Sequence, residues 1–542
     1  MSDGAPALRG TALPPCVLHE DEHLLLVVKP AGWNSHAPAP FAGEGIYEWL
    51  RHREPRWAGL AIVHRLDRDT SGLMVLAKTP LASRSLTAQF RAREVRKSYL
   101  LLSDRRGPSG EQRLEAAIAR QGERYVVRSE ARGGRPATTV FRPAGEGTGP
   151  DGRPATRIIA EPLTGRSHQI RVHAAAGGFP VLGDGLYGGG RAARLCLHAW
   201  RLGLRHPASE EWLDFEVAED FVADPRVALR AAFIDPAETS AFRLIHGAAD
   251  GQPGLYVDRL GGVLLAQSEA ELAAATLQRF AAGGAEGLYH KRLDRQVRRL
   301  EPAQAAPRHV GGQAAPARFV VREHAVDYEL GCAEGYSVGL FLDQRDNRRR
   351  FLTGHVAAGF PLYGAGPAQP GVLNVFAYTC GFSVCAALAG ARVTSLDLSR
   401  KYLDWGRRNF ELNSLDPAAH DFIYGDAFDW LGRLARKGLR YEALVLDPPT
   451  FSQAKGSGRF RVESDYGRLL AAALPVLAPG GVLLACANTA RLAPDDFVAG
   501  VRAAVAAAGR SVDAEHYAPQ APDFPVSPAE PAYLKTLWLR VG

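Results

Sequence analysis

The sequence predicts two or three folded units, with an α+β unit in front and a parallel α/β unit behind. Its 542 residues exceed the roughly 250–300 residues at which a single hydrophobic core stops growing. Up to about residue 225, short apolar runs are bounded by Gly, Pro and Asp, which is typical of a mixed or antiparallel sheet. From about Val320 onward, apolar runs alternate with helix-like stretches, which indicates a parallel sheet covered by helices. We therefore expect three regions: 1–228, 229–318 and 319–542.

The front and middle regions contain few expected helices. The strands expected in front are Leu24–Val28, Leu73–Ala77, Ser98–Leu102, Tyr125–Val127 and Arg157–Glu161, with a hairpin loop over Gly145–Pro154. The middle region has an apolar run at Val263–Ala266 and a helix-like stretch at Leu272–Ala281. Its end, Glu301–Ala317, is rich in Pro, Ala and Gly, so we expect a linker there.

The rear region alternates strands and helices. The expected strands are Gly371–Ala377, Val393–Asp397, Ala443–Asp447 and Gly481–Ala485, and helices are expected after Gly381 and over Ser399–Asn413. In open sheets of this kind, ligands bind at the carboxyl ends of the strands. Functional residues of the rear region are therefore expected where these strands end.

Composition excludes several classes of protein. A hydrophobic fraction of 46% and a charged fraction of 23% are those of ordinary globular chains, not of disordered or fibrous ones. Apolar runs fall short of the ~18–20 residues that a membrane-spanning helix needs, and the first ten residues lack the apolar core of a secretory signal. The six cysteines show no C-x-x-C or Cys/His spacing. We expect a cytoplasmic protein with reduced thiols, no metal site and no membrane partner.

Positive charge is concentrated in a few segments. The formal net charge is +7, and arginines cluster between Arg84 and Arg106 and in the run Arg345–Arg350. Such an excess favours contact with a polyanion, but on charge alone a run of this kind is more simply interpreted as a solvated face. Charge supports an RNA partner without establishing one.

A polar segment of the front region has the character of a catalytic loop. His64–Gly72 (HRLDRDTSG) precedes an apolar strand, although an aspartate between two arginines is, taken alone, most simply a surface ion pair. Three further segments accompany it in order: VVKPAG at 27–32, KSY at 97–99, and LTGRSHQIRVH at 163–173 followed by VLGD at 181–184. Together they resemble the motifs of RluA-type pseudouridine synthases over about residues 15–205.

This resemblance implies the roles of three residues. Asp67 is the expected catalytic carboxylate, which acts while the glycosidic bond of uridine breaks and the uracil rejoins through carbon. Arg166 is expected to pair with Asp67, because an adjacent cation favours the charged form of a carboxylate. Tyr99 offers a flat face for the uracil. No cofactor is expected, and His64, His168 and His173 are interpreted as hydrogen-bonded structural residues.

Acidic residues follow three successive strands of the rear region. The strand from Leu373 ends in a turn at Gly381, and Asp397, Asp426 and Asp447 follow the next three strands. Buried carboxylates are costly without partners, so these acids indicate a bound ligand. The segments DGQPGLYVDR at 250–259 and GLFLDQR at 339–345 then resemble the RlmI and RlmK group of ribosomal RNA methyltransferases, over about residues 240–540.

The second resemblance implies the cofactor S-adenosylmethionine (SAM) and a small α+β middle domain before an α/β, Rossmann-like class I methyltransferase domain. Asp397 is suited to the ribose hydroxyls and Asp426 to the adenine amino group. The full set of expected cofactor-binding residues is Gln344, Arg345, Asn374, Phe376, Tyr378, Thr379, Gly381, Asp397, Asp426 and Asp447.

The methylated atom depends on one position in this group. Members that methylate cytosine carbon need a cysteine nucleophile where this chain has Asn488, and Cys486 two residues earlier is interpreted as a small buried side chain. Asp447-Pro-Pro-Thr with Asn488 resembles the branch that methylates guanine N7, an atom that is already nucleophilic.

The sequence thus predicts a bifunctional RNA modification enzyme, with large-subunit ribosomal RNA as the first expected substrate and transfer RNA as the second. Three alternatives stay open at this point. One domain is catalytic and the other an RNA clamp, or the rear domain methylates cytosine C5, or the chain is a ribosome assembly factor without catalysis.

Overall fold

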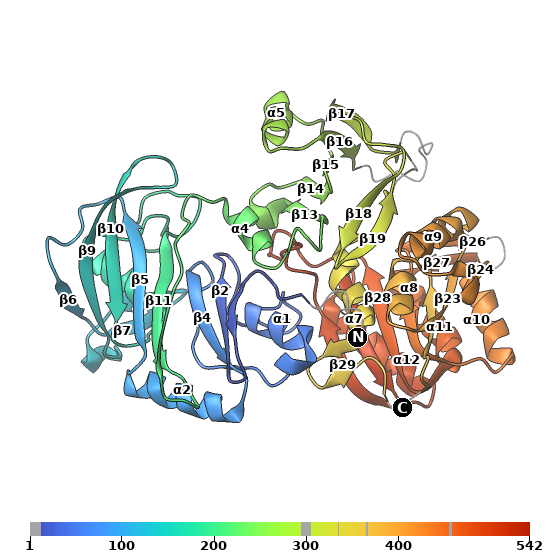
Figure 1. The fold of residues 1–542 in the computed structure, drawn as a ribbon, viewed down its shortest axis with the longest axis horizontal. Helices are drawn as coiled ribbons and strands as arrows, with labels where there is room; N and C mark the ends of the chain where they lie inside the picture. The colour runs from blue at the N-terminus through green and yellow to red at the C-terminus, as the bar shows by residue number, and fades with distance from the viewer. Residues whose placement is uncertain (1–11, 294–304, 334, 336, 365–366, 455–457) are drawn as a thin grey trace, which may run out of the picture.

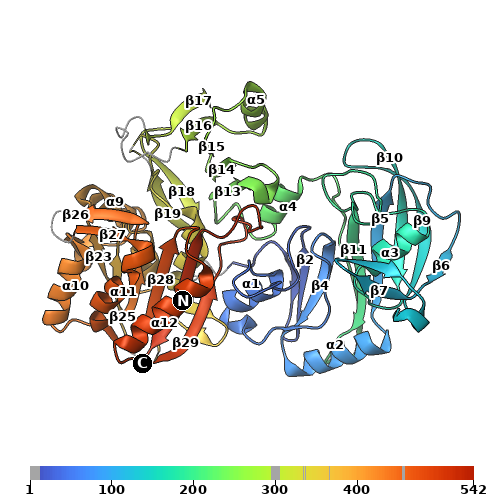
Figure 2. The ribbon, with the colours of Figure 1, turned by 180° about the vertical axis from the view of Figure 1, so that it is seen from behind.

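The computed structural model describes residues 12–293, 305–333, 335, 337–364, 367–454 and 458–542. Its strands form three main sheets, which we call the front, middle and rear sheets in chain order. Figures 1 and 2 show the front and rear sheets beside each other, with the smaller middle sheet lying above their junction. Among the helices in the described part of the chain, none is long and apolar enough to cross a bilayer.

The front sheet is mixed, as the sequence predicts. Its strand order is β1-β2-β4-β11-β5-β10-β9-β6, with β3 on β4 and β12 on β11, and its parallel pair is β4 with β11. The strands are β1 (Val17–Glu20), β2 (Leu24–Lys29), β3 (Ala61–Ile62), β4 (Ser71–Ala77), β5 (Arg96–Ser103), β6 (Gln112–Glu115), β9 (Thr138–Thr148), β10 (Pro154–Pro162), β11 (Leu197–Arg205) and β12 (Trp212–Glu216). A separate hairpin joins β7 (Ile118–Gln121) to β8 (Arg124–Val127), and the helices are α1 (Ile46–Arg53), α2 (Pro80–Ala92) and α3 (Gln169–Ala176).

The middle sheet follows a short connecting helix, α4 (Pro225–Ala231). It has the order β13-β14-β15-β16-β17, with helix α5 (Ala274–Ala282) between the parallel strands β15 and β16. The strands are β13 (Ala241–His246), β14 (Leu255–Leu260), β15 (Val263–Ser268), β16 (Gly287–Arg292) and β17 (Arg308–Gly312). The linker expected over Glu301–Ala317 is therefore wrong in part. Its residues 301–304 lie outside the described chain, and β17 pairs with β16 because sheet hydrogen bonding needs no apolar run.

The rear sheet is parallel except at one edge. Its order is β24-β23-β22-β25-β28-β30-β29, and only β30 runs against its neighbours. The strands are β22 (Gly371–Val375), β23 (Arg392–Asp397), β24 (Asp421–Tyr424), β25 (Tyr441–Leu446), β28 (Leu477–Asn488), β29 (Val512–Ala518) and β30 (Leu534–Val541). The chain starts at β22 in the centre and later returns beside it with β25. This is the switch point at which ligands bind.

Helices cover both faces of the rear sheet, which explains its unbroken apolar strands. Val372 packs in one core with residues of α8, whereas its neighbour Leu373 packs in another with residues of α10 and α11. The helices are α7 (Arg345–Thr353), α8 (Gly381–Leu388), α9 (Arg400–Leu412), α10 (Ala427–Arg436), α11 (Val462–Ala473) and α12 (Pro494–Ala507), and the small hairpins are β18–β19 (Phe319–Glu323, Val326–Leu330), β20–β21 (His355–Ala357, Phe360–Pro361) and β26–β27 (Phe451–Ala454, Gly458–Arg461).

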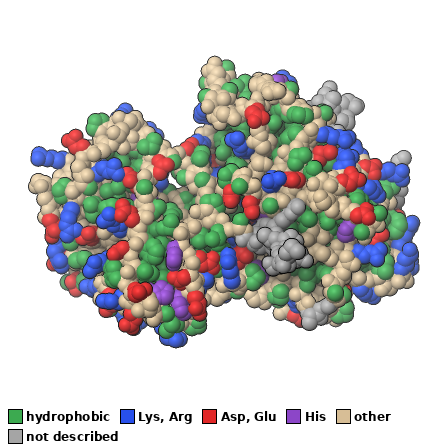
Figure 3. Space-filling view, in the orientation of Figure 1, with side chains coloured by type: hydrophobic (Ala, Val, Ile, Leu, Met, Phe, Trp, Pro, Cys, Tyr) green, Lys and Arg blue, Asp and Glu red, His purple; other side chains and the backbone are tan. Residues whose placement is uncertain are grey.

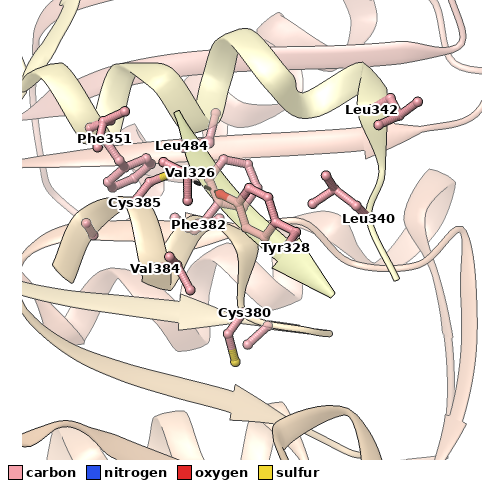
Figure 4. Close-up of a cluster of buried hydrophobic side chains, with 14 of the residues drawn as sticks. Val326, Tyr328, Leu340, Leu342, Phe351, Cys380, Phe382, Val384, Cys385 and Leu484 are labelled. Carbon is pink, nitrogen blue, oxygen red and sulfur yellow. Dashed lines mark hydrogen bonds between the residues drawn. The ribbon is translucent and has the colours of Figure 1, made fainter. Parts of the chain in front are cut away.

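The arginine run of α7 is buried, so the interpretation of this run as a solvated face is wrong. The guanidinium groups of Arg345, Arg348 and Arg349 meet the carboxylates of distant segments, which are Asp523, Glu323 and Glu54 respectively. The sequence did not reveal these partners because each lies far away along the chain. Figure 4 shows the apolar side of this region, where Phe351 of α7 packs beside Phe382 and Cys385 of α8 and Tyr328 of β19.

Charge on the outside is mixed. Figure 3 shows lysine and arginine side chains interspersed with acidic ones over the visible face, without one continuous basic patch. The excess positive charge of the chain is therefore not gathered on this face, and the active sites have to be located from local geometry.

Candidate active site

The front catalytic loop lies between β3 and β4 and is held from several sides. Lys29 is fully buried, and its ammonium donates to the carbonyls of Pro30 (2.9 Å), Trp33 (2.7 Å) and Arg68 (2.9 Å). Burial lowers the pKa of Lys29 to about 7, although Asp69 and Asp67 act in the opposite direction. At the end of the loop, Gly72 has φ +113°, and a Cβ there would lie 2.3 Å from the Ala199 carbonyl oxygen. The loop is thus fixed in position.

Asp67 meets Arg171 and not Arg166, which corrects the expected pairing. The carboxylate of Asp67 is 30% exposed, and its Oδ2 lies 3.9 Å from Nη1 of Arg171. Arg166 lies in the loop before α3, where its Nε donates to the Pro136 carbonyl (3.1 Å). The difference arises because α3 begins at Gln169 and turns Arg171 inward, toward the catalytic loop.

Arg171 is itself fixed by a second carboxylate. Its Nε and Nη2 donate to Asp184 over 2.7 and 2.8 Å, and its guanidinium lies over the Tyr187 ring. Although burial opposes it, Asp184 raises the pKa of Arg171. This bidentate pair leaves Nη1 directed to Asp67 and keeps the cation in place.

Tyr99, the third residue predicted for the synthase site, lies near the Asp67 carboxylate. Tyr99, on β5, is half-buried, and burial together with the nearby charge of Asp67 raises the pKa of its hydroxyl.

The three histidines of the front motifs make structural hydrogen bonds. His64 accepts from the Val75 amide (3.0 Å), His168 meets the Tyr187 hydroxyl (2.8 Å), and His173 meets Thr139 (2.9 Å).

The two arginines allow a direct test of this geometry. We expect Arg171→Lys to lower the rate of pseudouridine formation by about 10- to 100-fold, because a lysine ammonium cannot bind Asp184 bidentately and face Asp67 together. Arg166→Lys, its matched control, should change the rate less than about threefold. The measurement is the rate of pseudouridine formation by both variants on the same uridine-containing RNA. A larger loss in Arg166→Lys than in Arg171→Lys contradicts the assignment of Arg171 as the partner of Asp67.

The rear site lies where β22 ends. Phe376, Tyr378 and Cys380 each have positive φ (63°, 49° and 64°) although none is glycine. Such strain persists only where the surroundings enforce it, and it clusters at ligand sites. The Tyr378 ring packs edge-on against Tyr402 (4.6 Å between centroids) and at a tilt against Phe341 (5.2 Å), so aromatic side chains border the loop.

Two of the predicted acids also support backbone turns. Asp397 accepts from the amides of Tyr378 (Oδ2, 2.8 Å) and Ser399 (Oδ1, 2.8 Å), and burial raises its pKa despite these bonds. Asp426 caps α10 by accepting from the amides of Phe428 and Asp429. A carboxylate has about four acceptor sites, so Asp397 keeps capacity for hydroxyl groups of a ligand.

Several predicted cofactor residues lie beneath the loop. Asn374 is buried and donates to Ser383 (2.9 Å), Thr379 donates to the Gly339 carbonyl (2.5 Å), and Arg345 is buried against Asp523. Gly381 begins α8 next to Arg348. The Asn374 and Thr379 side chains thus bind neighbouring protein groups around the loop, and Arg345 pairs with Asp523, so direct cofactor contact by these three residues stays a prediction.

Gln344 and Asp447 form the inner wall of the site. Gln344 donates from Nε2 to Asp447 Oδ2 (3.1 Å). Burial, together with the nearby Asp343, raises the pKa of Asp447 to about 7. Asp343 in turn accepts from the Tyr533 hydroxyl (2.9 Å). Asp343 and Asp447 thus lie near each other at the end of β25, and the charge of Asp343 is one cause of the raised pKa of Asp447.

The cysteine considered as a nucleophile is inaccessible. Cys486 on β28 is fully buried, and burial raises the pKa of its thiol well above the ordinary value. Asn488, two residues on, is half-buried at the end of the same strand, and its carbonyl accepts from Thr450. All six cysteines of the chain are buried and free.

Comparisons with known proteins agree with this division. The family model described as RNA pseudouridylate synthase matches residues 23–176, and that described as S-adenosylmethionine-dependent methyltransferase matches residues 243–540. The chain belongs to this methyltransferase family and carries an RNA pseudouridylate synthase domain in front. The two predicted family resemblances and the predicted fold class are thereby confirmed, and SAM is the cofactor of the methyltransferase domain.

Named relatives match the methyltransferase part. The Ribosomal RNA large subunit methyltransferase of Deinococcus radiodurans is 34% identical over 333 residues, which is 59% of this chain and 78% of that protein. The Ribosomal RNA large subunit methyltransferase I of Klebsiella pneumoniae is 35% identical over 315 residues, 56% of this chain and 74% of that protein. The solved structure of Human RNA Pseudouridylate Synthase Domain Containing 1 aligns with 40% of this chain and 86% of its own, at 26% identity and a TM-score of 0.33.

The methyltransferase site fits its cofactor. Asp397 and Asp426 follow neighbouring strands and supply acceptors for hydroxyl and amino groups, while the rings of Tyr378 and Phe341 supply an apolar border. Near Gln344, Asp447 adds negative charge that suits a cationic sulfonium. When bound, SAM supplies the electrophilic methyl group.

Sequence reasoning missed Lys29, Arg171, Asp184 and Asp343 as site residues, although each lies in a motif that it quoted. The available signal was the presence of two arginines, five residues apart, in LTGRSHQIRVH. A helix that starts between the two arginines leaves Arg166 in the preceding loop and gives Arg171 a fixed direction on the helix. That spacing would have favoured Arg171 as the partner of Asp67.

Proposed function

We propose that this chain is a bifunctional enzyme that modifies large-subunit ribosomal RNA, with transfer RNA as the second candidate. The synthase domain isomerises uridine to pseudouridine, and the methyltransferase domain methylates a base, in our proposal a guanine nitrogen. The presence of both domains and the names of the curated relatives support the proposal. We place the domains at 1–228, 229–318 and 319–542, and the enzyme in the cytoplasm.

The synthase activity rests on the Asp67 carboxylate, which is partly exposed on a fixed loop beside Arg171. In the reaction the N1–C1′ bond of uridine breaks, the uracil turns, and a C5–C1′ bond forms while C5 loses its proton and N1 gains one. Asp67 is the group that assists bond breaking, Arg171 holds it, and Tyr99 borders the uracil, which must leave its stack to enter.

The methyl transfer that we propose needs no protein nucleophile. Guanine N7 carries a free lone pair, and alkylation there requires no proton to leave, so holding the base at the correct distance and angle provides the catalysis. Carboxylate oxygens of Asp343 and Asp447 line the base of the site, where they would accept from the donor edge of guanine and offset the positive charge of its N7-methyl product.

Cytosine C5 methylation is the alternative reaction, and replacing Cys486 tests it. We expect Cys486→Ala to retain methyl transfer within about threefold, because a buried thiol contributes packing and not chemistry. The matched control Cys385→Ala, which removes another buried thiol, should behave alike. Loss of more than about 1,000-fold in Cys486→Ala alone identifies a thiol nucleophile and contradicts guanine methylation.

The deciding experiment is a nucleoside-resolved mass map of ribosomal and transfer RNA from cells with and without the gene. We expect the deletion to lose one pseudouridine and one methylated guanine, and Asp67→Ala to restore only the methyl group. Loss of a single modification favours one catalytic domain with the other as an RNA clamp. If neither modification changes, the chain is not a modification enzyme, and the alternative of a ribosome assembly factor without catalysis is favoured.

A further inference from the structure

The helix α7 touches both catalytic domains. Its residues Asp346 and Arg349 contact α1 of the synthase domain, whereas Gln344, immediately before it, contacts Asp447 in the methyltransferase site. Figure 1 shows α1 facing the region of α7 and β29 across the junction of the front and rear sheets. One short element therefore joins the synthase domain to the methyl-transfer chemistry.

At its front end, α7 determines how the Gln344 amide is oriented. Asn347 donates from Nδ2 to Gln344 Oε1 (2.7 Å), which leaves Nε2 of Gln344 to donate to Asp447. Asn347 is itself held, because its Oδ1 accepts from Trp538 (3.0 Å) and Arg350 (3.3 Å). A shift of α7 therefore moves the Gln344 amide that donates a hydrogen bond to Asp447.

At its side, α7 is held by α1 and the residue after it. Trp49 donates from Nε1 to Asp346 (3.2 Å), Arg349 donates to the Arg53 carbonyl (2.7 Å), and Arg349 also pairs with Glu54. Both partners of the last pair are buried. Burial and the neighbouring Arg53 lower the pKa of Arg349, so Glu54 balances a crowded positive site.

Further contacts extend the same junction. The Ala358 amide donates to His52 of α1 (3.1 Å), and the rings of His52 and His516 lie 4.6 Å apart. Phe41 of the synthase domain packs on Tyr517 of β29 at 4.8 Å. Buried ion pairs and ring contacts of this kind resemble a domain core and not a transient contact between domains.

We propose that the synthase domain positions the methyltransferase site, with Glu54 holding Arg349 and thereby fixing α7, Gln344 and Asp447. Glu54 is a positioning residue for methyl transfer that touches neither RNA nor SAM. The inference rests on the proposed methyl transfer, and it goes beyond that proposal by making the docked synthase domain a requirement for the second reaction.

The test compares Glu54→Ala, Glu54→Asp and the control Glu20→Gln in the full chain. Glu20 is a fair control because it pairs with Lys78 (2.8 Å) and accepts from Trp57 (2.8 Å) inside the synthase domain. In Glu54→Ala we expect kcat for methyl transfer to fall at least about tenfold with KM for RNA unchanged, since the reacting groups are misplaced while the RNA surface is intact. Glu54→Asp should recover most of the rate, and pseudouridine formation should stay unchanged in both variants.

Hydrogen exchange supplies a readout that needs no substrate. We expect Glu54→Ala, and not Glu20→Gln, to speed exchange of the α7 amides at least about tenfold, because the helix loses a buried partner. Unchanged exchange in α7, or parallel loss of both activities in Glu54→Ala and Glu20→Gln, overturns the proposal. If the wild-type chain methylates no RNA, the proposed function fails in its second half, while the exchange data still decide whether Glu54 holds α7.

Discussion

Replacing Asp67 with asparagine is expected to lower the rate of pseudouridine formation by at least about 1,000-fold while methyl transfer proceeds at the wild-type rate. Asparagine keeps the size and shape of the side chain but loses the negative charge and replaces one acceptor oxygen by an amide donor. Because Arg171 lies 3.9 Å from the Asp67 oxygen and is held by Asp184, the loop should keep its shape in the variant. The effect therefore isolates the carboxylate.

Single-turnover conversion of a uridine-containing RNA, read as pseudouridine by mass spectrometry, measures this rate. Asp69→Asn is the matched control, since Asp69 lies two residues away in the same loop, is exposed and meets Arg68 at 3.7 Å. We expect it to retain the rate within about threefold, as exposed ion pairs contribute little. An Asp67→Asn enzyme that converts uridine at more than a tenth of the wild-type rate contradicts the assigned role.

The elements of the fold that sequence periodicity predicts are those with one simple pattern. The strands Leu24–Val28 and Val393–Asp397 appear within one residue of their expected ends, because unbroken apolar residues between turn signals leave few alternatives. β17 was missed, since Arg308–Gly312 is polar and glycine-rich and pairs through backbone groups at the sheet edge. Pairing of that kind depends on the neighbouring strand, which the local sequence does not contain.

For the site, motifs predicted which segments meet but not how each side chain is used. The segments of Asp67 and Arg171 do converge, and so do those of Gln344 and Asp447. Arg166 and Arg171 share one motif, however, and only the start of α3 decides which of them faces inward. Likewise, Asn374 lies in β22 just before the cofactor loop, and its amide donates to Ser383 of α8. Orientation at this scale follows from tertiary packing.

The burial of the arginine run could not be predicted from the local sequence, because it depends on charged partners elsewhere in the chain. Six residues from Arg345 to Arg350 carry four arginines, a composition that is normally exposed because buried charges need partners. The partners come from three distant segments of the chain: Glu54 lies in the synthase domain, and Glu323 and Asp523 lie in the methyltransferase domain. Segments that are unrelated in sequence thus depend on one another for the burial of their charges.

Removing the buried partner of Arg345 should therefore have the largest effect on stability. Arg345 donates from Nη1 and Nη2 to Asp523 over 2.8 and 2.7 Å, and the two side chains are 1% and 0% exposed. Burial alone lowers the pKa of Arg345, but Asp523 raises it above the ordinary value, so the arginine stays charged. Asp523→Ala removes both of these hydrogen bonds and leaves Arg345 only the longer contact of its Nε with Asp346 (3.6 Å), so we expect the free energy of unfolding to fall by about 3–5 kcal/mol.

Urea unfolding of the methyltransferase domain, followed by hydrogen exchange of the rear sheet, measures this loss. Glu515→Gln is the control, because it breaks an Arg502 pair of similar geometry (2.6 Å) on the surface and should cost about 0–1 kcal/mol. The double variant Arg345→Met/Asp523→Leu removes both charges and should recover most of the stability, since apolar groups of similar volume replace a buried pair well. If the double variant is as unstable as Asp523→Ala, the loss comes from packing, and the unpaired charge is not its cause.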